Sequence, residues 1–272
     1  MTAVRRVVAV EVDLPDAELA ADVLWQTDPS AVGEEDLGNG RVRLTADISE
    51  SGSLADLPPS ATVRVLELDG EDYLDRWRAW ARPMRAGTRV VIQPAWLPVA
   101  TTGPADLIVS IDPGRTFGSG AHPSTRLVLT AMEEHLTAGG RVLDVGTGSG
   151  VLAVTACLLG ASVAVAIDID PRAIDIAEAN ARANGVGDRI AVSTTPLDGV
   201  SESFDLVVAN IGAAVLCDLA GELAQRVAPR GTLVLAGFLD DQARQVANAF
   251  ATFEQLISLS EDGWSAAVLR QA

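Results

Sequence analysis

The stretch Arg141–Ala153, RVLDVGTGSGVLA, decides the fold of this chain. Its first five residues are largely apolar and predict a buried strand, and the residues after Gly150 predict a helix. Asp144 lies two residues before Gly146, and Gly148 and Gly150 follow at alternate positions. Glycines at a strand-to-helix turn allow a tight backbone and leave room for a ligand to approach. The stretch therefore predicts a ligand-binding turn in an α/β domain.

The acid and the glycine spacing together indicate which ligand this turn binds. A carboxylate beside the loop suits a cationic or hydroxyl- and amine-rich ligand, and it does not suit a pyrophosphate. The spacing G-x-G-x-G also differs from the G-x-G-x-x-G of dinucleotide folds. We expect S-adenosylmethionine (SAM) as the cofactor, bound by Asp144, Gly146, Gly148 and Gly150. From the glycine loop alone, a nicotinamide dinucleotide stays an alternative.

A second acid, Asp168, supports the nucleoside hypothesis. It ends the next apolar strand, Val163–Ile167, on the order of 20 residues past the first glycine, where an acid can accept hydrogen bonds from a ribose diol. The alternative role, capping of the following helix, falls to Asp170, which precedes Pro171 at the start of that helix. We therefore predict that Asp168 binds the cofactor.

Composition limits the class of partner. The formal net charge is −17, and all 20 basic residues are arginine. An acidic chain is unsuited to docking directly on nucleic-acid phosphates, and it favours a basic partner through long-range attraction. Solubility alone is an equally consistent explanation of the acidity. We expect a basic protein substrate and no direct contact with nucleic acid, and the sequence leaves the oligomeric state open.

The chain shows no membrane-length apolar stretch and no signal peptide, so we expect a cytoplasmic protein. Cys157 and Cys217 lie in apolar contexts and are expected to be buried free thiols. Its two histidines, His122 and His135, stand apart from any cluster with ligand spacing, so no metal site is expected.

Three regions follow one another along the chain. Residues 1–70 show a strand over 8–13, a helix after Leu14, and strands over 41–47 and 62–68, which predicts a small ferredoxin-like α+β domain for substrate recognition. Residues 71–100 are expected to be an interdomain linker with a helix, marked by Tyr73, Trp77 and Trp80, and a strand over 89–92.

Residues 101–272 alternate strand and helix, the pattern of a doubly wound α/β domain. Strands are predicted over 141–145, 163–168, 189–193, 204–209, 231–236, 253–258 and 264–270. Because the last two are separated by a short turn, they predict a closing antiparallel hairpin. The fold class we expect is α/β, a seven-stranded Rossmann-like methyltransferase sheet preceded by the ferredoxin-like domain.

Two further residues are candidates for the site. Asn210 ends the strand 205–209, where its amide oxygen could accept a hydrogen bond from an attacking amine and aim the nitrogen lone pair at a methyl group. An ordinary cap of the next helix, 213–227, is the alternative. The loop Asp112–Thr125 is expected to cover the methionine end of SAM, with Thr125 hydrogen-bonded to it, unless Ser124 or Thr125 only caps the helix 126–135.

Several of these segments resemble the ribosomal protein L-eleven methyltransferase family (PrmA type). FGSGAHPST at 117–125 resembles that family's FGTGTHPTT. In the family's order follow DVGTGSGVLA, AIDIDPRAI, EANARANGV with Asn180 and Asn184, DLVVANI and AGFLDDQ. The resemblance covers about residues 71–272 and departs from the family pattern at Ala81, Arg82, Gly212 and Ala236.

The resemblance implies a SAM-dependent N-methyltransferase. Its SAM contacts would be Thr125, Gly146, Asp168 and Asn210, with Asn210 as the catalytic residue that orients the amine. Its substrate would be lysine side chains, the N-terminal amine, or both, of one large-subunit ribosomal protein. The alternatives are methylation of another protein or a small amine, and a SAM-binding module without catalysis.

Overall fold

The computed structural model describes residues 6–25, 27, 32–48, 53–66, 82–98, 103–114, 120 and 122–271. The chain divides into two compact units, Met1–Ala81 and Arg82–Ala272. The helix expected over 71–80 and most of the loop at 115–121 lie outside the described residues.

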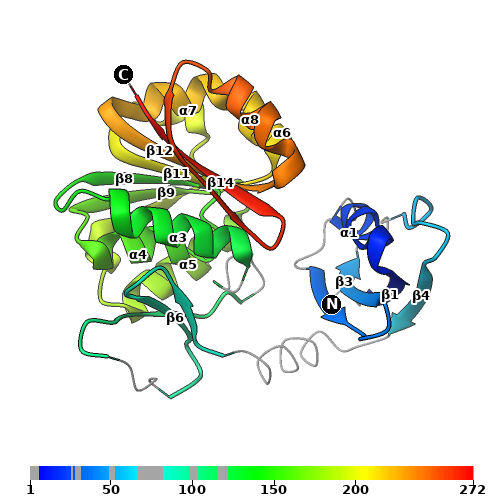
Figure 1. Cartoon of the computed structure of the whole chain (residues 1–272). Coiled ribbons are helices and arrows are strands. Elements are labelled where there is room, and N and C mark those ends of the chain that lie inside the picture. The colour runs from blue at the N-terminus through cyan, green and yellow to red at the C-terminus, as the bar shows by residue number, and fades with distance from the viewer. Residues whose placement is uncertain are drawn as a thin grey trace. The chain divides into compact units, whose positions relative to one another are not determined.

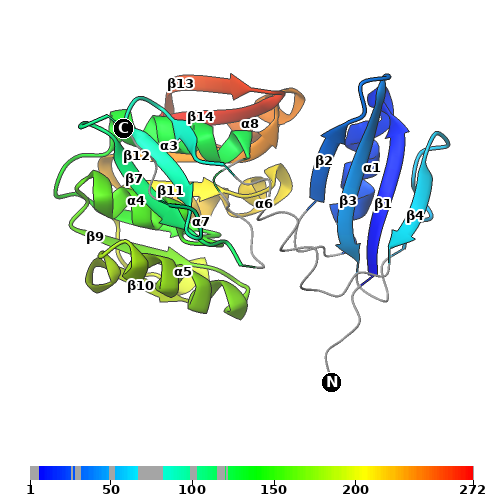
Figure 2. The same cartoon turned by 90° about the horizontal axis from the view of Figure 1, so that it is seen from below.

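The N-terminal unit is a four-stranded antiparallel sheet with one helix packed on it (Figure 2). Its elements are β1 (Arg6–Asp13), α1 (Ala17–Trp25), β2 (Val32–Asp36), β3 (Arg41–Ile48) and β4 (Thr62–Leu66), with a 3-10 turn at Leu14–Asp16. The strand order β2-β3-β1-β4 places β3 between β1 and β2, which is the split β-α-β arrangement of ferredoxin-like domains.

Sequence patterning missed one strand of this unit. β2 has the sequence VGEED, whose single apolar residue gives no alternation, and it forms because it pairs antiparallel with β3. Apolar side chains from β1, α1 and β3 make the core of the unit, with Val8, Val10 and Leu24 fully buried.

The larger unit contains a seven-stranded sheet in the order β10-β9-β8-β11-β12-β14-β13. The strands are β8 (Arg141–Val145), β9 (Val163–Ile167), β10 (Ile190–Ser193), β11 (Phe204–Asn210), β12 (Val227–Leu239), β13 (Glu254–Glu261) and β14 (Trp264–Arg270). The first five run parallel, and β14 is antiparallel to both β12 and β13. The expected α/β sheet and its terminal hairpin are confirmed.

Helices cover both faces of this sheet (Figure 1). They are α3 (Pro123–His135), α4 (Val151–Leu159), α5 (Pro171–Ala183), α6 (Ala213–Asp218), α7 (Ala220–Arg226) and α8 (Ala243–Ala249), with 3-10 turns at Gly187–Arg189, Leu197–Gly199 and Asp240–Gln242. Alternate residues of β8 show the division: Val142 packs in the core with α3 and α4, whereas Leu143 packs with α6, α7 and α8. The single helix expected over 213–227 is wrong, because the structure breaks it at Leu219 into α6 and α7.

A second, three-stranded sheet packs on the outer side of α3 and α4 (Figure 1). It consists of β5 (Met84–Ala86), β6 (Val90–Pro94) and β7 (Leu107–Ile111), in that order, with β6 and β7 parallel. The described part of the expected linker, residues 82–98, therefore belongs to the larger unit. The expected boundaries at residues 70 and 100, and the substrate-recognition role of the first domain, stay predictions.

Candidate active site

The glycine loop between β8 and α4 has a backbone that only glycine adopts easily. Gly146, Gly148 and Gly150 have φ values of +74°, +53° and +79°, in the left-handed region. A Cβ on Gly146 would lie 2.5 Å from the Cγ2 of Ile211, and a Cβ on Gly150 would lie 2.9 Å from the Cβ of Ala177. The loop therefore combines a tight turn with close packing on both sides.

Asp144 supports this loop from inside the protein. Its side chain is fully buried, and Oδ2 accepts hydrogen bonds from Thr147 Oγ1 (2.6 Å) and from the backbone N–H of Ala153 (3.2 Å). The other carboxylate oxygen, Oδ1, is buried and has no hydrogen-bond partner. Burial, with a smaller contribution from the charge of Asp168, raises the pKa of Asp144 to about 7.

Asp168 follows β9 and reaches the glycine loop from the neighbouring strand. Its Oδ2 accepts a hydrogen bond from the Gly148 N–H (2.8 Å), and its Oδ1 accepts one from the Asp170 N–H (2.9 Å). As expected, Asp170 rather than Asp168 caps α5, by accepting from the Arg172 N–H. The next residue, Ile169, is 96% exposed, an unusual position for a large apolar side chain that the sequence analysis did not single out.

Asn210 and Thr125 meet although 85 residues separate them. Asn210 is the last residue of β11, and its Nδ2 donates to Thr125 Oγ1 at 3.3 Å. Because this bond fixes the orientation of the amide, the Oδ1 atom is left buried and without a hydrogen-bond partner. A buried carbonyl oxygen in this state keeps an unused capacity to accept a hydrogen bond. Ile211, next in the chain, packs against Gly146 and joins the two parts of the site.

The helix α3 begins at Pro123, before the expected start at 126, and the alternative role of Ser124 or Thr125 as its cap is wrong. Neither Ser124 nor Thr125 caps the helix; His122 does, through Nδ1, which accepts from the Ser124 N–H. The His122 ring lies edge-to-face on Trp264 of β14 at 4.4 Å, and burial and the nearby Arg126 lower the pKa of His122 to about 4. A neutral imidazole at neutral pH follows. Trp264 was missed because nothing in the sequence links the terminal hairpin to α3.

The hairpin is also tied to α3 by charge. Arg126 Nη2 lies 2.7 Å from Glu261 Oε1 and 3.3 Å from Asp262 Oδ2, so the first turn of α3 holds the turn between β13 and β14. The Arg126 side chain is 16% exposed, whereas Glu261 is 39% and Asp262 is 73% exposed, so solvent screens the bond to Asp262 more than the bond to Glu261.

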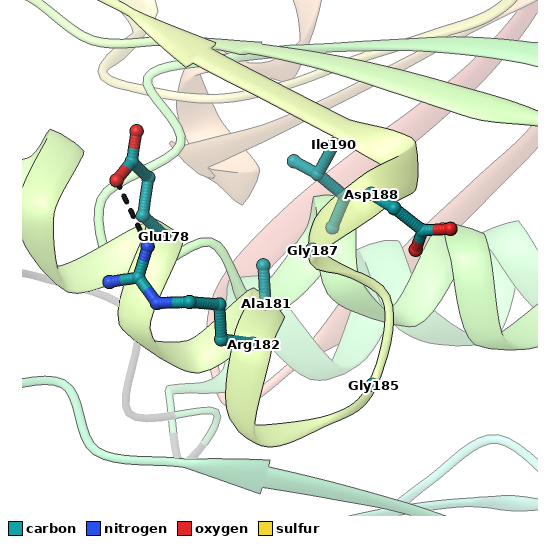
Figure 3. Close-up of a pocket in the computed structure, with 7 residues that line it drawn as sticks. All are labelled: Glu178, Ala181, Arg182, Gly185, Gly187, Asp188 and Ile190. Atoms are coloured by element: carbon teal, nitrogen blue, oxygen red, sulfur yellow. Dashed lines mark hydrogen bonds and ion pairs between the residues drawn. The ribbon is translucent and has the colours of Figure 1, made fainter.

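A cavity of about 550 Å³ lies elsewhere in this unit (Figure 3). It is lined by the C-terminal half of α5 and the start of β10, including Arg182, Asp188 and Ile190, and the Glu178–Arg182 ion pair stands at its wall. Since Ile190 begins its strand, the cavity lies at the amino ends of the parallel strands. Ligands of open α/β sheets bind at the carboxyl ends, so this cavity is not the expected cofactor site.

The expected residues form one site at the carboxyl ends of three adjacent strands, β9, β8 and β11. Asp168, the glycine loop with Asp144 beneath it, and Asn210 with Thr125 follow one another along this edge. Two observations fit SAM: a glycine loop at positive φ, with no Cβ on its alternate residues, and the Asp168 carboxylate that reaches this loop from the neighbouring strand. Together with the strand order, the site defines the class of SAM-dependent methyltransferases.

Comparison with known proteins names the family. A family model described as ribosomal protein L11 methyltransferase (PrmA) matches residues 39–272. The curated ribosomal protein L11 methyltransferase of Geobacter sp. (strain M21) is 40% identical over 248 residues, which cover 88% of this chain and 79% of that protein. That of Symbiobacterium thermophilum is 41% identical over 234 residues, which cover 85% of this chain and 76% of that protein. The chain belongs to the ribosomal protein L11 methyltransferase family.

A solved structure agrees with this assignment. The crystal structure of a ribosomal protein L11 methylase from Lactobacillus delbrueckii subsp. bulgaricus superposes with a TM-score of 0.65 and 30% identity, covering 71% of this chain and 100% of that one. The family assignment confirms the resemblance, the methyltransferase activity and SAM as the cofactor. Within the described residues, no helix is long and apolar enough to cross a membrane.

Proposed function

We propose that this protein uses SAM to methylate amino groups, on lysine side chains or at the N-terminus, of ribosomal protein L11 from the same organism. The observation that supports this most directly is the Asn210–Thr125 pair, whose hydrogen bond leaves Asn210 Oδ1 buried and unpaired. A neutral amine has N–H groups to donate to such an oxygen and a lone pair on the same nitrogen. The amide oxygen therefore suits an amine nucleophile.

SAM supplies a methyl group already activated on a sulfonium, so the chain needs to align the nucleophile rather than activate the methyl. Thr125 holds the Asn210 amide in one orientation, and Asn210 Oδ1 then accepts from the amine and directs its lone pair. A lysine amine, with a pKa of about 10.4, must lose a proton first, and burial in an apolar site lowers that pKa. Trp264 and Ile211 supply apolar surface beside the site.

We assign the cofactor-binding roles as follows. The cofactor lies against the loop backbone at Gly146, Gly148 and Gly150, and Asp168 accepts hydrogen bonds from the ribose hydroxyls. Asp144 supports the loop from inside the protein, and its ionised carboxylate attracts the positive charge of SAM. Ile169 offers an exposed apolar surface next to Asp168 on which the adenine ring can lie. The N-terminal unit recognises the substrate, and the net charge of −17 favours a basic one. A cytoplasmic location, as expected for such a substrate, belongs to this proposal.

The test is intact-mass spectrometry of purified ribosomal protein L11 from the same organism, incubated with this protein and SAM. We expect mass steps of one methyl group each, followed by peptide mapping to lysine or N-terminal amines, and no detectable steps with Asn210→Ala in the same incubation time. An unchanged mass, with SAM binding confirmed separately by calorimetry, would overturn the substrate assignment. Methyl groups on arginine or histidine would overturn the amine chemistry.

A further inference from the structure

Asn180 on α5 and Asn184 at its C-cap bind the backbone at the end of β7. The Asn184 side chain accepts from the Ser110 N–H (2.9 Å) and donates to the Ser110 carbonyl oxygen (2.7 Å). The Asn180 side chain does the same at Asp112, with distances of 3.0 Å and 2.9 Å. Each amide therefore satisfies both backbone groups of one residue, as a neighbouring strand would.

The rise per residue explains why Asn180 and Asn184, four residues apart, match Ser110 and Asp112, two residues apart. Four helical residues rise about 6 Å, and two residues of a strand rise about 6.6 Å. The match continues one step further: a Cβ on Gly114 would lie 3.0 Å from Cδ1 of Ile176, which precedes Asn180 by four residues. The chain thus lies along α5 from Ser110 to Gly114, where the loop toward Thr125 begins.

Each asparagine donates a second bond, but to different partners. Asn180 Nδ2 also donates to the carbonyl oxygen of Ser149 at 2.8 Å, inside the glycine loop, whereas Asn184 Nδ2 also donates to the carbonyl oxygen of Asn180 at 2.8 Å. Asn180 is 3% exposed and Ser149 is fully buried. A buried acceptor that loses its donor costs more than an exposed one, because water cannot replace the bond. One side chain therefore joins the glycine loop to the base of the loop 112–125.

We propose that Asn180 is a positioning residue for cofactor binding, which fixes the glycine loop relative to the base of the loop 112–125. Asn184 seats β7 on α5 without touching the glycine loop. The inference rests on the proposed function, since the glycine loop is taken as the SAM site. It assigns to a buried asparagine a role exerted through the two loops that it bonds.

The test compares Asn180→Asp with Asn184→Asp, measuring SAM affinity by calorimetry and the thermal midpoint of each variant. Both substitutions keep the shape of the side chain and remove its two donated bonds, so they are matched. We expect Asn180→Asp to raise the Kd for SAM about 10- to 100-fold at about pH 8, and Asn184→Asp to raise it less than about threefold. Both should lower the thermal midpoint.

A pH series separates positioning from general destabilisation. The carboxyl introduced at 180 faces two carbonyl oxygens in a buried place, which raises its pKa above the usual value of about 3.9. Once protonated, it can donate one of the two lost bonds, so the affinity of Asn180→Asp should recover in part relative to the wild type as the pH falls toward about 5. If Asn180→Asp does not fold, Asn180→Ala, which removes the donors without adding charge, replaces it in the comparison at about pH 8.

The outcomes are distinct. Equal losses of affinity in the variants at 180 and 184, or an Asn180→Asp defect that does not change with pH, would overturn the positioning role. The wild-type titration is a separate result: a wild-type protein that does not bind SAM would overturn the proposed function, whatever the variants do. Tight wild-type binding with a pH-dependent defect at position 180 alone would support the inference.

Discussion

The glycine loop and the Asn210–Thr125 pair lie at the same edge of the sheet but are held in different ways. The loop is held from within the stretch β8 to α5, where Asp144 bonds to Thr147 and Ala153, Asp168 bonds to Gly148, and Asn180 bonds to Ser149. The pair joins the end of β11 to the start of α3, across 85 residues. The cofactor side is therefore built within one contiguous stretch of the chain, whereas the side that orients the nucleophile joins β11 to α3 and depends on how α3 packs.

This difference predicts how substitutions should act. Changes in the glycine loop should impair SAM binding, and changes in the Asn210–Thr125 pair should impair turnover while leaving SAM binding largely intact. Four experiments test this separation, from the largest expected effect to the smallest.

Gly146→Val should weaken SAM binding at least about 100-fold, since a β-branched residue is strained at positive φ and its Cβ would lie 2.5 Å from Ile211 Cγ2. Calorimetric titration with SAM measures the effect. Gly139→Val is the matched control: its φ of +79° is similar, but a Cβ there meets no atom within 4 Å. Similar losses in both variants would show that backbone strain, rather than the clash with Ile211, weakens binding.

Asn210→Ala should lower kcat about 100-fold and change the Kd for SAM less than about threefold, because it removes the oxygen that orients the amine. Steady-state rates on ribosomal protein L11 and SAM titration give the two values. Equal losses in kcat and SAM affinity would contradict the orienting role and would indicate that Asn210 acts in cofactor binding instead.

Asp168→Ala should raise the Kd for SAM about tenfold, through loss of charged hydrogen bonds to the ribose and of the bond to the Gly148 N–H. S-adenosylhomocysteine has the same ribose, so its Kd should rise by a similar factor in the same titration. A larger loss for SAM than for S-adenosylhomocysteine would indicate that Asp168 acts on the sulfonium charge instead.

Asp144→Asn should give the smallest and most specific effect, a change in how the affinity for SAM depends on pH. With its pKa raised to about 7, the buried carboxyl is partly protonated at neutral pH, and its ionised form attracts cationic SAM. Wild-type affinity should therefore rise a few-fold as the pH increases through about 7, and the variant should show no such rise. The same slope in both proteins would exclude Asp144 as its source.

The sequence predicted the elements whose patterns are local. Apolar runs bounded by glycine or an acid located the parallel strands, and Asp170-Pro171 located the start of α5, because capping and strand burial depend on neighbouring residues. β2 and the break at Leu219 escaped prediction. β2 forms because it pairs with β3. The break between α6 and α7 falls at Leu219, which is neither a glycine nor a proline.

By itself, the sequence determined the class of sheet, the glycine loop, the acid at the end of β9 and the family, since each depends on short motifs in a fixed order. Only the tertiary structure decided that Asn210 bonds to Thr125, that Trp264 packs on His122, and that Asn180 joins two loops. Hydrogen bonds between distant segments depend on the packing of whole elements. No pattern within either segment records the partner it meets.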